Sequence, residues 1–476
     1  MTGQNRSFAG SSRPWLSAKQ LDLLHAASLK IMEDPGMRFY SQEALALFRK
    51  AGARVSDGNL VRIPPALTEK ALSSAPRELI VYDRGGQPAM SFGGGECWFG
   101  TGSDCLHIYD PDSGLRRRAV LQDVVHAARL VDALPNLDFL MSMFLPSDVP
   151  SESYERRQMQ VLLEESSKPI VFCGLAAEST RQAVEMAAAV AGGEQALARR
   201  PFVLNYINTP SALRHNEESV SRLLYAAQRN LPTIYAPGNC RGSTAPMSVA
   251  AMTALGNAGQ LGGLVLSQLA REGSPFVLNQ PSVGALDMRW MRDLYVSPDK
   301  GPAGCDLARR YGLPVFASGG ASDAKLFDTQ AAAEAALSLF AAVTSGANLV
   351  QNVGYLDSAL TGSLELMVLC DEIVGWLRRY LRGVEVSEES LCLRMIREAG
   401  PDGDYLAAED TVARLREDWL PELFDRSSCE SWAEEGKTTL EQRANRKARR
   451  LIAEHRAAPL PEPARAALAR LAGAPA

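Results

Sequence analysis

The stretch KPIVFCGLAAESTRQAVEMAAAVAGGEQALARRPFVLNYINTP, residues 168–210, decides the fold class. It holds two short apolar runs, at 169–174 and 202–208, on either side of an Ala-rich amphipathic segment at 178–192. Runs that are apolar throughout, rather than alternating, are typical of parallel strands covered on both faces. The segment between them has the length of a crossover helix, so the stretch predicts a strand–helix–strand unit.

The same rhythm continues outward from this unit in both directions. Further apolar runs lie at 137–145, 232–237, 275–280, 314–319 and 348–355. Amphipathic or Ala-rich segments separate them, at 155–166, 215–229, 246–271, 326–345 and 362–382. Seven such strands favour a TIM (β/α)8 barrel over a doubly wound sheet. The eighth strand is either the glycine-rich segment 95–101 or a run that the pattern does not reveal.

Sequence outside this rhythm divides the chain into three parts. Residues 1–118 are predicted to hold N-terminal helices and a small antiparallel β region, because ELIVYDRGGQPAMSF (78–92) joins two β-prone runs by a glycine turn. Residues 119–390 are predicted to form the barrel core, and residues 391–476 a C-terminal extension packed on the barrel. The predicted fold class is therefore α/β, a TIM (β/α)8 barrel with an N-terminal helical and β extension and a C-terminal extension.

Composition excludes several classes of protein. The 476 residues are 46% hydrophobic and 22% charged, with a formal net charge of −5, which is typical of a soluble globular protein. The sequence contains no uninterrupted apolar run of about 20 residues, the length that a membrane-spanning helix needs. The opening MTGQNRSFAGSSRPW lacks the apolar core of a signal peptide. The slightly acidic balance argues against a nucleic-acid partner. We therefore expect a cytoplasmic protein with no membrane and no nucleic-acid partner.

Cysteine and histidine spacing predicts no metal site. The eight cysteines are scattered without a CxxC pair, and the five histidines are equally dispersed. This pattern indicates reduced, isolated thiols rather than disulfides or zinc ligands. No GxGxxG follows a predicted strand and no GxxxxGK[ST] occurs, which disfavours a nicotinamide site and excludes a P-loop.

Residues that follow the apolar runs are the candidates for an active site, because barrel enzymes build it at the carboxyl ends of their strands. These positions are rich in amides and rings, and they hold no histidine and no Ser/His/Asp set. The inventory argues against acid–base hydrolysis and suits a neutral or cationic small molecule. The residues predicted to bind it are Asn205, Tyr206, Asn352, Tyr355, Phe144, Trp98 and Gln280.

Aromatic residues in this set suggest a cage for a quaternary ammonium. Ring faces attract a cation once water is excluded, and each ring contributes about 0.5–2 kcal/mol. Trp98, Phe144 and Tyr355 are the predicted cage rings; Phe99, Tyr206 and Trp290 are further ring candidates. The alternative is that each ring belongs to the core or to a lid.

The loop GGASDAKLFDTQAAAEAA (319–336) holds the one closely spaced charge pair among these positions, Asp323 and Lys325. We predict that both are catalytic. Asp328 has two alternative roles, one in the site and one as the N-cap of the Ala-rich helix that follows.

Several long segments carry a family resemblance. They include FGTGSDCLHIYDPDSGLRRRAVLQDVVHAARLVDALPNLDF (99–139), STAPMSVAAMTALGNAGQLGGLVLSQL (243–269), ASDAKLFDTQAAAEAALSLFAAVTSGANLVQNVGYL (321–356) and DWLPELFDR (418–426). In their order and spacing along nearly the whole chain they resemble the trimethylamine methyltransferase (MttB) superfamily. The chain lacks pyrrolysine, so it resembles the non-pyrrolysine members. It also has EDT (409–411) where the family carries a histidine–threonine pair, which puts a role for that histidine in doubt.

The resemblance implies a TIM barrel and methyl transfer from a methylamine or quaternary amine to the Co(I) corrinoid of a partner protein. The chain itself then binds no cofactor, since the cobalamin is presented by that corrinoid protein; this fits the absence of an Asp-x-His-x-x-Gly pattern. A homo-oligomer is also expected. A quaternary nitrogen already carries the charge that makes the amine a leaving group, so a glycine betaine-like substrate is favoured. Lys325, Asn205 and Asn352 would bind its carboxylate.

Two other functions stay open at this point. The first is a demethylase that uses tetrahydrofolate directly as the methyl acceptor. The second is a protein that only binds a betaine and catalyses nothing.

Overall fold

Seven parallel strands form the central sheet of the protein in the computed structural model, which describes residues 13–93, 95–280, 283–299, 301–415 and 419–473. Their order is β6-β18-β17-β14-β12-β10-β9, and every neighbouring pair is parallel. Six of them coincide with predicted apolar runs, and the seventh is the glycine-rich segment named as a candidate. The strands are β6 (Trp98–Phe99), β9 (Ile170–Phe172), β10 (Val203–Thr209), β12 (Thr233–Pro237), β14 (Phe276–Asn279), β17 (Val315–Ser318) and β18 (Leu349–Gln351).

The remaining predicted run, 137–145, lies between the two edges of this sheet. Phe139 forms a parallel bridge with Gly100 beside β6, and Leu140 forms one with Ile170 of β9. The sheet therefore curls until both edge strands meet the same short extended segment. The parallel α/β architecture expected from the sequence is confirmed.

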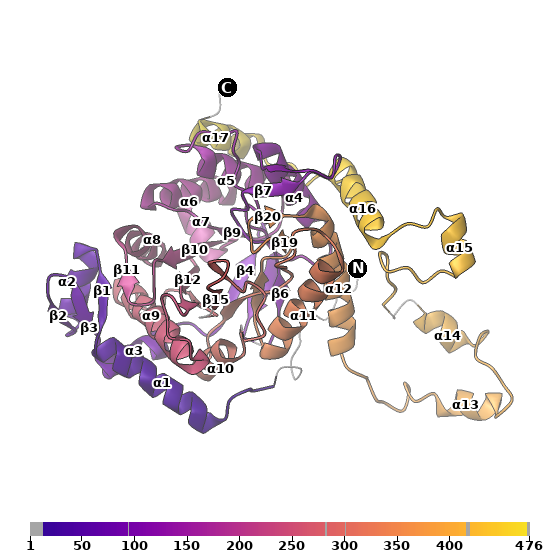
Figure 1. The fold of residues 1–476 in the computed structure, drawn as a ribbon, viewed down its shortest axis with the longest axis horizontal. Coiled ribbons are helices and arrows are strands. Elements are labelled where there is room, and N and C mark those ends of the chain that lie inside the picture. The colour runs from indigo at the N-terminus through magenta and orange to yellow at the C-terminus, as the bar shows by residue number, and fades with distance from the viewer. Residues whose placement is uncertain (1–12, 94, 281–282, 300, 416–418, 474–476) are drawn as a thin grey trace.

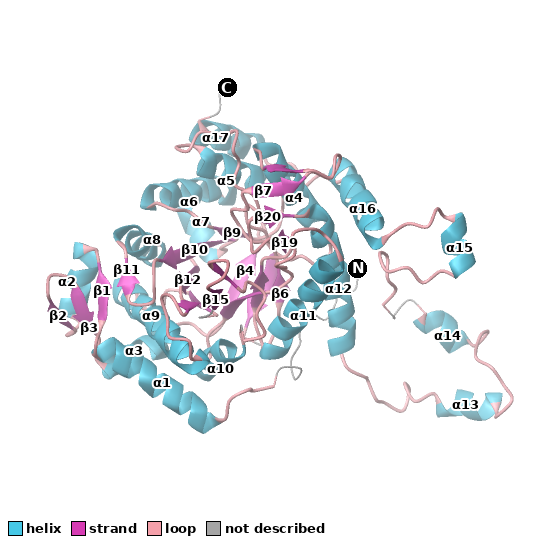
Figure 2. Cartoon of the chain, in the orientation of Figure 1, coloured by secondary structure: helices cyan, strands magenta, loops and turns pink. Residues whose placement is uncertain are grey.

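Helices surround the curled sheet on its outer side (Figures 1 and 2). Their apolar faces and the outward-facing strand residues make one continuous core. Asp328 caps α11 through a side-chain bond from the Ala331 N–H, so the capping alternative is confirmed. The surrounding helices are α4 (Leu121–Ala133), α5 (Tyr154–Glu165), α6 (Ala177–Ala191), α7 (Glu194–Arg199), α8 (Glu217–Gln228), α9 (Val249–Ala270), α10 (Pro302–Tyr311), α11 (Thr329–Ser345) and α12 (Leu364–Leu381).

Among the described residues, one helix, α9, is long and apolar enough to cross a membrane by length and composition alone. However, 78% of its apolar window is buried inside the fold. Small residues allow this burial, because a Cβ on Gly263 would lie 2.4 Å from the Tyr235 ring and one on Gly259 would lie 2.5 Å from the Ala212 carbonyl oxygen. The helix is a core element of the barrel wall.

The inside of the sheet forms a second apolar cluster, which the hairpin of β4 (Leu79–Tyr82) and β5 (Pro88–Phe92) closes at one end. Val81 and Phe92 of the hairpin belong to the same cluster as Leu204 and Phe316, which lie near the amino ends of their strands. Hydrogen bonds from Tyr82 and Arg84 to the carbonyls of Pro201 and Ser167 fix it beside the residues that enter the sheet. The hairpin therefore covers the amino end of the barrel, and the strand exits lie at the opposite, carboxyl end, which is the mouth of the barrel.

The N-terminal part of the chain lies against the outer wall at the lower left of Figure 1. Its helices α1 (Ala18–Glu33) and α3 (Pro65–Ser74) pack on α9. A four-stranded sheet in the order β11-β1-β3-β2 ties it to the barrel, because β11 comes from the loop after β10. This sheet and its helix comprise β1 (Met37–Phe39), α2 (Gln42–Lys50), β2 (Arg54–Ser56), β3 (Leu60–Arg62) and β11 (Arg214–His215).

Two small sheets stand at the carboxyl end of the barrel. The first has the order β19-β20-β7-β8 and joins the exit of β18 to the exit of β6. The second has the order β13-β15-β16 and is built from the exits of β12 and β14. Their strands are β7 (His107–Tyr109), β8 (Arg116–Arg118), β13 (Cys240–Arg241), β15 (Val283–Asp287), β16 (Arg292–Asp293), β19 (Tyr355–Leu356) and β20 (Thr361–Gly362).

The C-terminal part of the chain has helices that pack on the barrel and helices that project from it. Helix α16 (Leu440–Glu454) packs on α12 and α4, and α17 (Glu462–Ala472) packs on α5 and α6. Helices α13 (Leu393–Ala399), α14 (Glu409–Arg414) and α15 (Cys429–Glu434) instead project to the right of the body in Figure 1.

Candidate functional site

Strand β10 shows which predicted residues face the inside of the barrel. Leu204 and Tyr206 belong to or pack against the inner cluster, whereas Val203 and Ile207 belong to the outer core. Side chains alternate along a strand, so Asn205 faces the outer helices rather than the mouth. It is 2% exposed, and its amide nitrogen lies 3.4 Å from the Pro232 carbonyl oxygen. Asn205 is thus separated from the other candidates by the sheet itself.

Tyr206 faces the inside of the barrel. Its ring packs on Phe316 with centroids 5.4 Å apart. Burial raises the pKa of its phenol, and hydrogen bonds with the side chains of Gln351 and Asn208 oppose the shift. The phenol is therefore neutral at physiological pH and stands among polar groups from the exits of β18 and β10.

Asn352 and Tyr355 meet a third residue, Tyr295, which the sequence patterns do not single out. The Asn352 amide nitrogen donates to the Tyr295 hydroxyl at 2.6 Å and to the Ser318 hydroxyl at 2.9 Å. The Tyr295 and Tyr355 rings are tilted, with centroids 6.2 Å apart. Burial holds the pKa of both phenols well above the usual value. The exits of β14, β17 and β18 thus contribute one connected set of amide, hydroxyl and ring.

The segment Gly102–Ser103–Asp104 completes this set from the exit of β6. The Tyr355 hydroxyl donates to the Ser103 carbonyl. A Cβ on Gly102 would lie 2.1 Å from the Tyr355 hydroxyl oxygen and 2.5 Å from the Asn352 amide oxygen, so the approach requires glycine. Asp104 follows with a positive φ of 69°, a conformation that turns the chain sharply at the mouth.

Asp104 is the acidic group of the site. Burial raises the pKa of its carboxyl, hydrogen bonds with Ser103 and Cys173 oppose that shift, and the nearby Glu155 carboxylate adds to it. Its charge also reaches the phenols of Tyr206 and Tyr355, where it helps to raise their pKa. Among the described residues, no ion pair joins Asp104 to a cation, and a positively charged ligand would stabilise such a carboxylate.

Cys173 follows β9 directly and lies beside Asp104. Burial raises the pKa of its thiol to about 12, so it is protonated at physiological pH. Because the thiolate is the nucleophilic form, this cysteine acts as a hydrogen-bonding neighbour of Asp104.

Asp323 and Lys325 do not pair with each other through their side chains. The Asp323 carboxylate accepts from the Val296 N–H at 2.9 Å and from the Ser358 hydroxyl at 2.6 Å, and so joins two loops of the mouth. The Lys325 amine reaches only the backbone carbonyl of Asp323 and lies 3.4 Å from the Asp357 carboxylate. The lysine side chain is 63% exposed.

Asp357 is the centre of a cationic rim outside the mouth. Its carboxylate, 11% exposed, lies 2.8 Å from Arg292, 3.4 Å from Arg116 and 3.4 Å from Lys325. The three cations come from the exits of β14, β6 and β17. The rim thus gathers three cationic side chains around one carboxylate.

Of the other three predicted residues, Gln280 contacts Ser318 of this set, whereas Trp98 and Phe144 pack in apolar clusters. Trp98 belongs to the inner cluster at the closed end, where its indole N–H donates to the Ser91 carbonyl of the hairpin at 2.9 Å. Phe144 is fully buried, and a Cβ on Gly362 would lie 2.4 Å from its ring. Gln280 is 5% exposed, and its side-chain oxygen lies 3.4 Å from the Ser318 backbone nitrogen.

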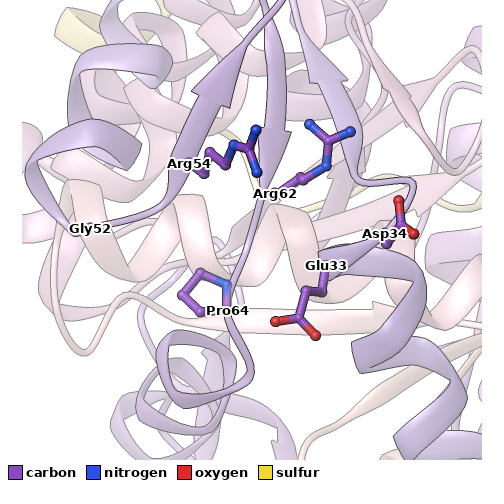
Figure 3. A pocket seen from close by; sticks show the side chains of 6 residues that line it. All are labelled: Glu33, Asp34, Gly52, Arg54, Arg62 and Pro64. Atoms are coloured by element: carbon purple, nitrogen blue, oxygen red, sulfur yellow. The ribbon is translucent and has the colours of Figure 1, made fainter.

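A cavity of about 510 Å³ lies far from the mouth, between the end of α1 and strands β2 and β3 (Figure 3). Arg54 and Arg62 line one side, and Glu33 and Asp34 line the other. Its charges balance, and it contains none of the predicted residues. Among the described residues, no group of three or more His, Cys, Asp or Glu side chains is placed to hold a metal ion.

Comparison with known proteins identifies the kind of enzyme. A family model described as trimethylamine methyltransferase (MTTB) matches residues 11–472. The chain belongs to this family. Trimethylamine methyltransferase MttB of Desulfitobacterium hafniense (strain DSM 10664 / DCB-2) is 30% identical over 450 residues, which cover 94% of this chain and 90% of that protein.

A second relative is glycine betaine methyltransferase of Desulfitobacterium hafniense (strain Y51). It is 31% identical over 446 residues, covering 92% of each chain. The chain, like these relatives, is a methyltransferase. The solved structure of Methanosarcina barkeri monomethylamine methyltransferase (MtmB) has a TM-score of 0.51 at 12% identity and covers 95% of this chain and 89% of that one, which shows a shared fold.

The site residues that the structure of this family member brings together differ from the residues predicted from the sequence. Tyr206, Asn352 and Tyr355 are brought together; Tyr295, Asp104 and Cys173 are additional. Counting 95–101 as a strand would have pointed to Asp104, since its exit begins there. Tyr295 carries no such signal, because it lies well beyond the end of β14 and reaches the mouth through the β15–β16 hairpin.

Proposed function

We propose that this methyltransferase transfers a methyl group from a quaternary amine, of the glycine betaine type, to the Co(I) corrinoid of a separate cytoplasmic protein. The observation that carries the proposal is the half-buried carboxyl of Asp104, whose charge reaches the phenols of Tyr206 and Tyr355 at the exits of two other strands. A permanently charged ammonium would be held by the ring faces and would shift Asp104 to its ionised form.

The chain's own residues bind, orient and exclude water. The hydrogen bonds of Asn352 with Tyr295 and Ser318 fix the ring orientations before the substrate arrives, which reduces the cost of ordering the site. A quaternary nitrogen leaves as a neutral tertiary amine, so the reaction needs no proton donor at that atom. This requirement agrees with the neutral phenols and the protonated thiol around it.

The corrinoid, when presented by its carrier, supplies the nucleophile that accepts the methyl group. The cationic rim of Arg116, Arg292 and Lys325 has donors of the kind that bind amide or acidic groups at the edge of a corrinoid and its carrier. A carboxylate on the amine would point toward the same rim, since the Asn352 amide nitrogen is already engaged and Asn205 faces away.

The experiment combines the purified chain with a reduced corrinoid protein and a panel of betaines and methylamines, and follows the corrinoid absorbance. We expect transfer from a quaternary amine, and none when the corrinoid protein is omitted. Transfer to tetrahydrofolate without the corrinoid protein would instead support the demethylase reaction. Tight binding of a betaine with no turnover on either acceptor would contradict the proposal.

The Asp104→Asn variant tests the site itself in the same assay, with a quaternary amine and a neutral carbon isostere as ligands. We expect weaker binding of the amine and unchanged binding of the isostere. Equal effects on both would show that Asp104 acts only through packing.

A further inference from the structure

Residues 383–415 form an arm that leaves the body at the end of α12. Figure 1 shows it extending away from the barrel, with α13 and α14 near its far end. Neither helix contains a buried residue. The described hydrogen bonds of the arm are local, such as those between Ser387 and Ser390 and between Thr411 and Tyr405.

Helices this short need a packing partner. They have seven and six residues, and isolated helices below about 12 residues are marginal in water. The arm also displays apolar side chains that its own chain leaves in solvent. Their exposed fractions are 88% for Val384, 66% for Leu393, 49% for Ile396, 85% for Leu406 and 69% for Val412. The arm therefore has the character of a segment that is covered by another surface.

The body exposes an aromatic patch on the two helices next to the root of the arm. We define the patch as Leu337 and Phe340 of α11 with Trp376 and Tyr380 of α12. Trp376 and Tyr380 are stacked with centroids 5.0 Å apart, and Phe340 lies 6.4 Å from Tyr380. The exposed fractions of the four side chains run from 40% to 69%. Contiguous exposed rings of this kind mark an interaction site.

Charge also distinguishes the arm from the body. Residues 383–415 contain eight acidic and three basic residues, a net charge of −5, which equals the formal net charge of the whole chain. The rest of the chain is therefore neutral overall. Basic residues Arg379 and Arg382 stand at the end of α12, next to the patch, whereas Arg378 is buried and paired with Asp138. An acidic, apolar arm is complementary to an aromatic patch with a basic border.

We propose that the arm of one copy packs on the aromatic patch of a second copy, and that the exchange is reciprocal about a two-fold axis. Both surfaces belong to this chain and both lack cover in a single copy. They are adjacent in sequence, since the arm begins three residues after Tyr380, so in a two-fold dimer each patch meets the root of its partner's arm. The proposal does not depend on the substrate or on the methyl acceptor.

The test measures the molar mass of the full chain in solution by light scattering over a range of concentrations. We expect twice the mass of one chain, or an even multiple of it. The arm variant Leu393→Glu with Ile396→Glu, and the patch variant Phe340→Glu with Tyr380→Glu, should each give the mass of one chain. A control, Leu23→Glu with Leu115→Glu, changes charge equally at exposed positions elsewhere and should leave the mass unchanged.

Circular dichroism and thermal melting of each variant separate loss of the contact from loss of the fold. Mixing the arm variant with the patch variant, each with a different tag, then tests the exchange. One of the two contacts is intact in the mixed dimer, so we expect the two chains to co-purify although neither self-associates. A wild-type chain that stays single at high concentration, a dimer that survives in either folded variant, or failure to co-purify would overturn the proposal.

Discussion

The side-chain amide of Asn352 donates a hydrogen bond of 2.6 Å to the phenol oxygen of Tyr295. One residue lies just after β18, and the other lies beyond a hairpin that follows β14. Their contact joins two exits that are separated by β17 in the sheet, and Ser318 of β17 receives the second bond from the same amide. The mouth is thus a preorganised set of neutral donors and rings, with Asp104 as its acidic member.

Replacing Asp104 by Asn should lower kcat/KM for a quaternary amine by about 100-fold, because loss of a buried charge partner costs roughly 2–4 kcal/mol. The pH profile gives a sharper test. The pKa of Asp104 is raised, so the free enzyme protonates it more readily than an ordinary aspartate. Since the ammonium needs the carboxylate, kcat/KM should rise with pH through that pKa in the wild type and lose this limb in Asp104→Asn. An unchanged profile would remove Asp104 from the site.

Two variants of Tyr355 separate the contribution of its hydroxyl to ligand affinity from that of its ring. Tyr355→Phe removes the hydrogen bond to the Ser103 carbonyl, and we expect affinity for a quaternary amine to fall by about 3- to 10-fold, the range for one neutral hydrogen bond. Tyr355→Leu also removes the ring face, which should cost a further 0.5–2 kcal/mol or so for a cation. Calorimetry with the amine and its neutral carbon isostere checks this: the additional loss in the leucine variant should appear for the cation alone.

Asp323 should act as a positioning residue. The two carboxylate oxygens of Asp323 accept hydrogen bonds from the Val296 N–H and the Ser358 hydroxyl. Asp323→Asn leaves only one acceptor oxygen, so it should loosen the loop that carries Tyr295. We expect KM to rise by about 5- to 10-fold with a smaller change in kcat. Loss of a proton-transferring group would instead lower kcat by about 100-fold or more.

Lys325→Met serves as the matched variant in the same loop. Its amine is exposed, so kcat with free reduced cobalamin should change by less than about 2-fold. A collapse of kcat in Lys325→Met would show that the lysine takes part in the chemistry after all.

The buried imidazole of His215 should make the free energy of unfolding depend on pH. Burial lowers the pKa of its imidazole to about 3, and its Nδ1 lies 2.7 Å from the Tyr235 hydroxyl. The unfolded chain binds the proton near pH 6.5, so the stabilising effect of the neutral ring is complete above that pH and is lost as pH falls toward 3. Urea midpoints should therefore fall between pH 7 and pH 4, with up to about 1.4 kcal/mol per pH unit from this group.

The His215→Asn variant keeps a polar group near Tyr235 but cannot titrate. It should be less stable than the wild type at pH 8, because it loses the stacking on Phe39, whose ring centroid lies 4.3 Å away. Its urea midpoint should depend less on pH between 7 and 4. Parallel slopes for the two proteins would assign the acid sensitivity to other groups.

Much of the fold followed from local pattern. Continuous apolar runs such as 169–174 and 202–208 predicted the strands, and the capping role of Asp328 was one of two alternatives. The site was predicted less well, since reading strand exits identified Tyr206, Asn352 and Tyr355 but also drew in Asn205 and Trp98. Alternation along β10 turns Asn205 outward, and Trp98 begins its strand at the closed end of the barrel.

Sequence by itself determined the strand–helix rhythm and the amide-rich, aromatic character of the strand exits, because both depend on residues that are near one another in the chain. It also determined the resemblance to one family, which depends on the order and spacing of segments and needs no tertiary contact. Tertiary structure alone decided that Asp104, Tyr295 and Cys173 join the site, that Asp323 bonds to two loops rather than to Lys325, and that the arm lies uncovered. These outcomes depend on how a curled parallel sheet brings exits together and on which way each side chain faces.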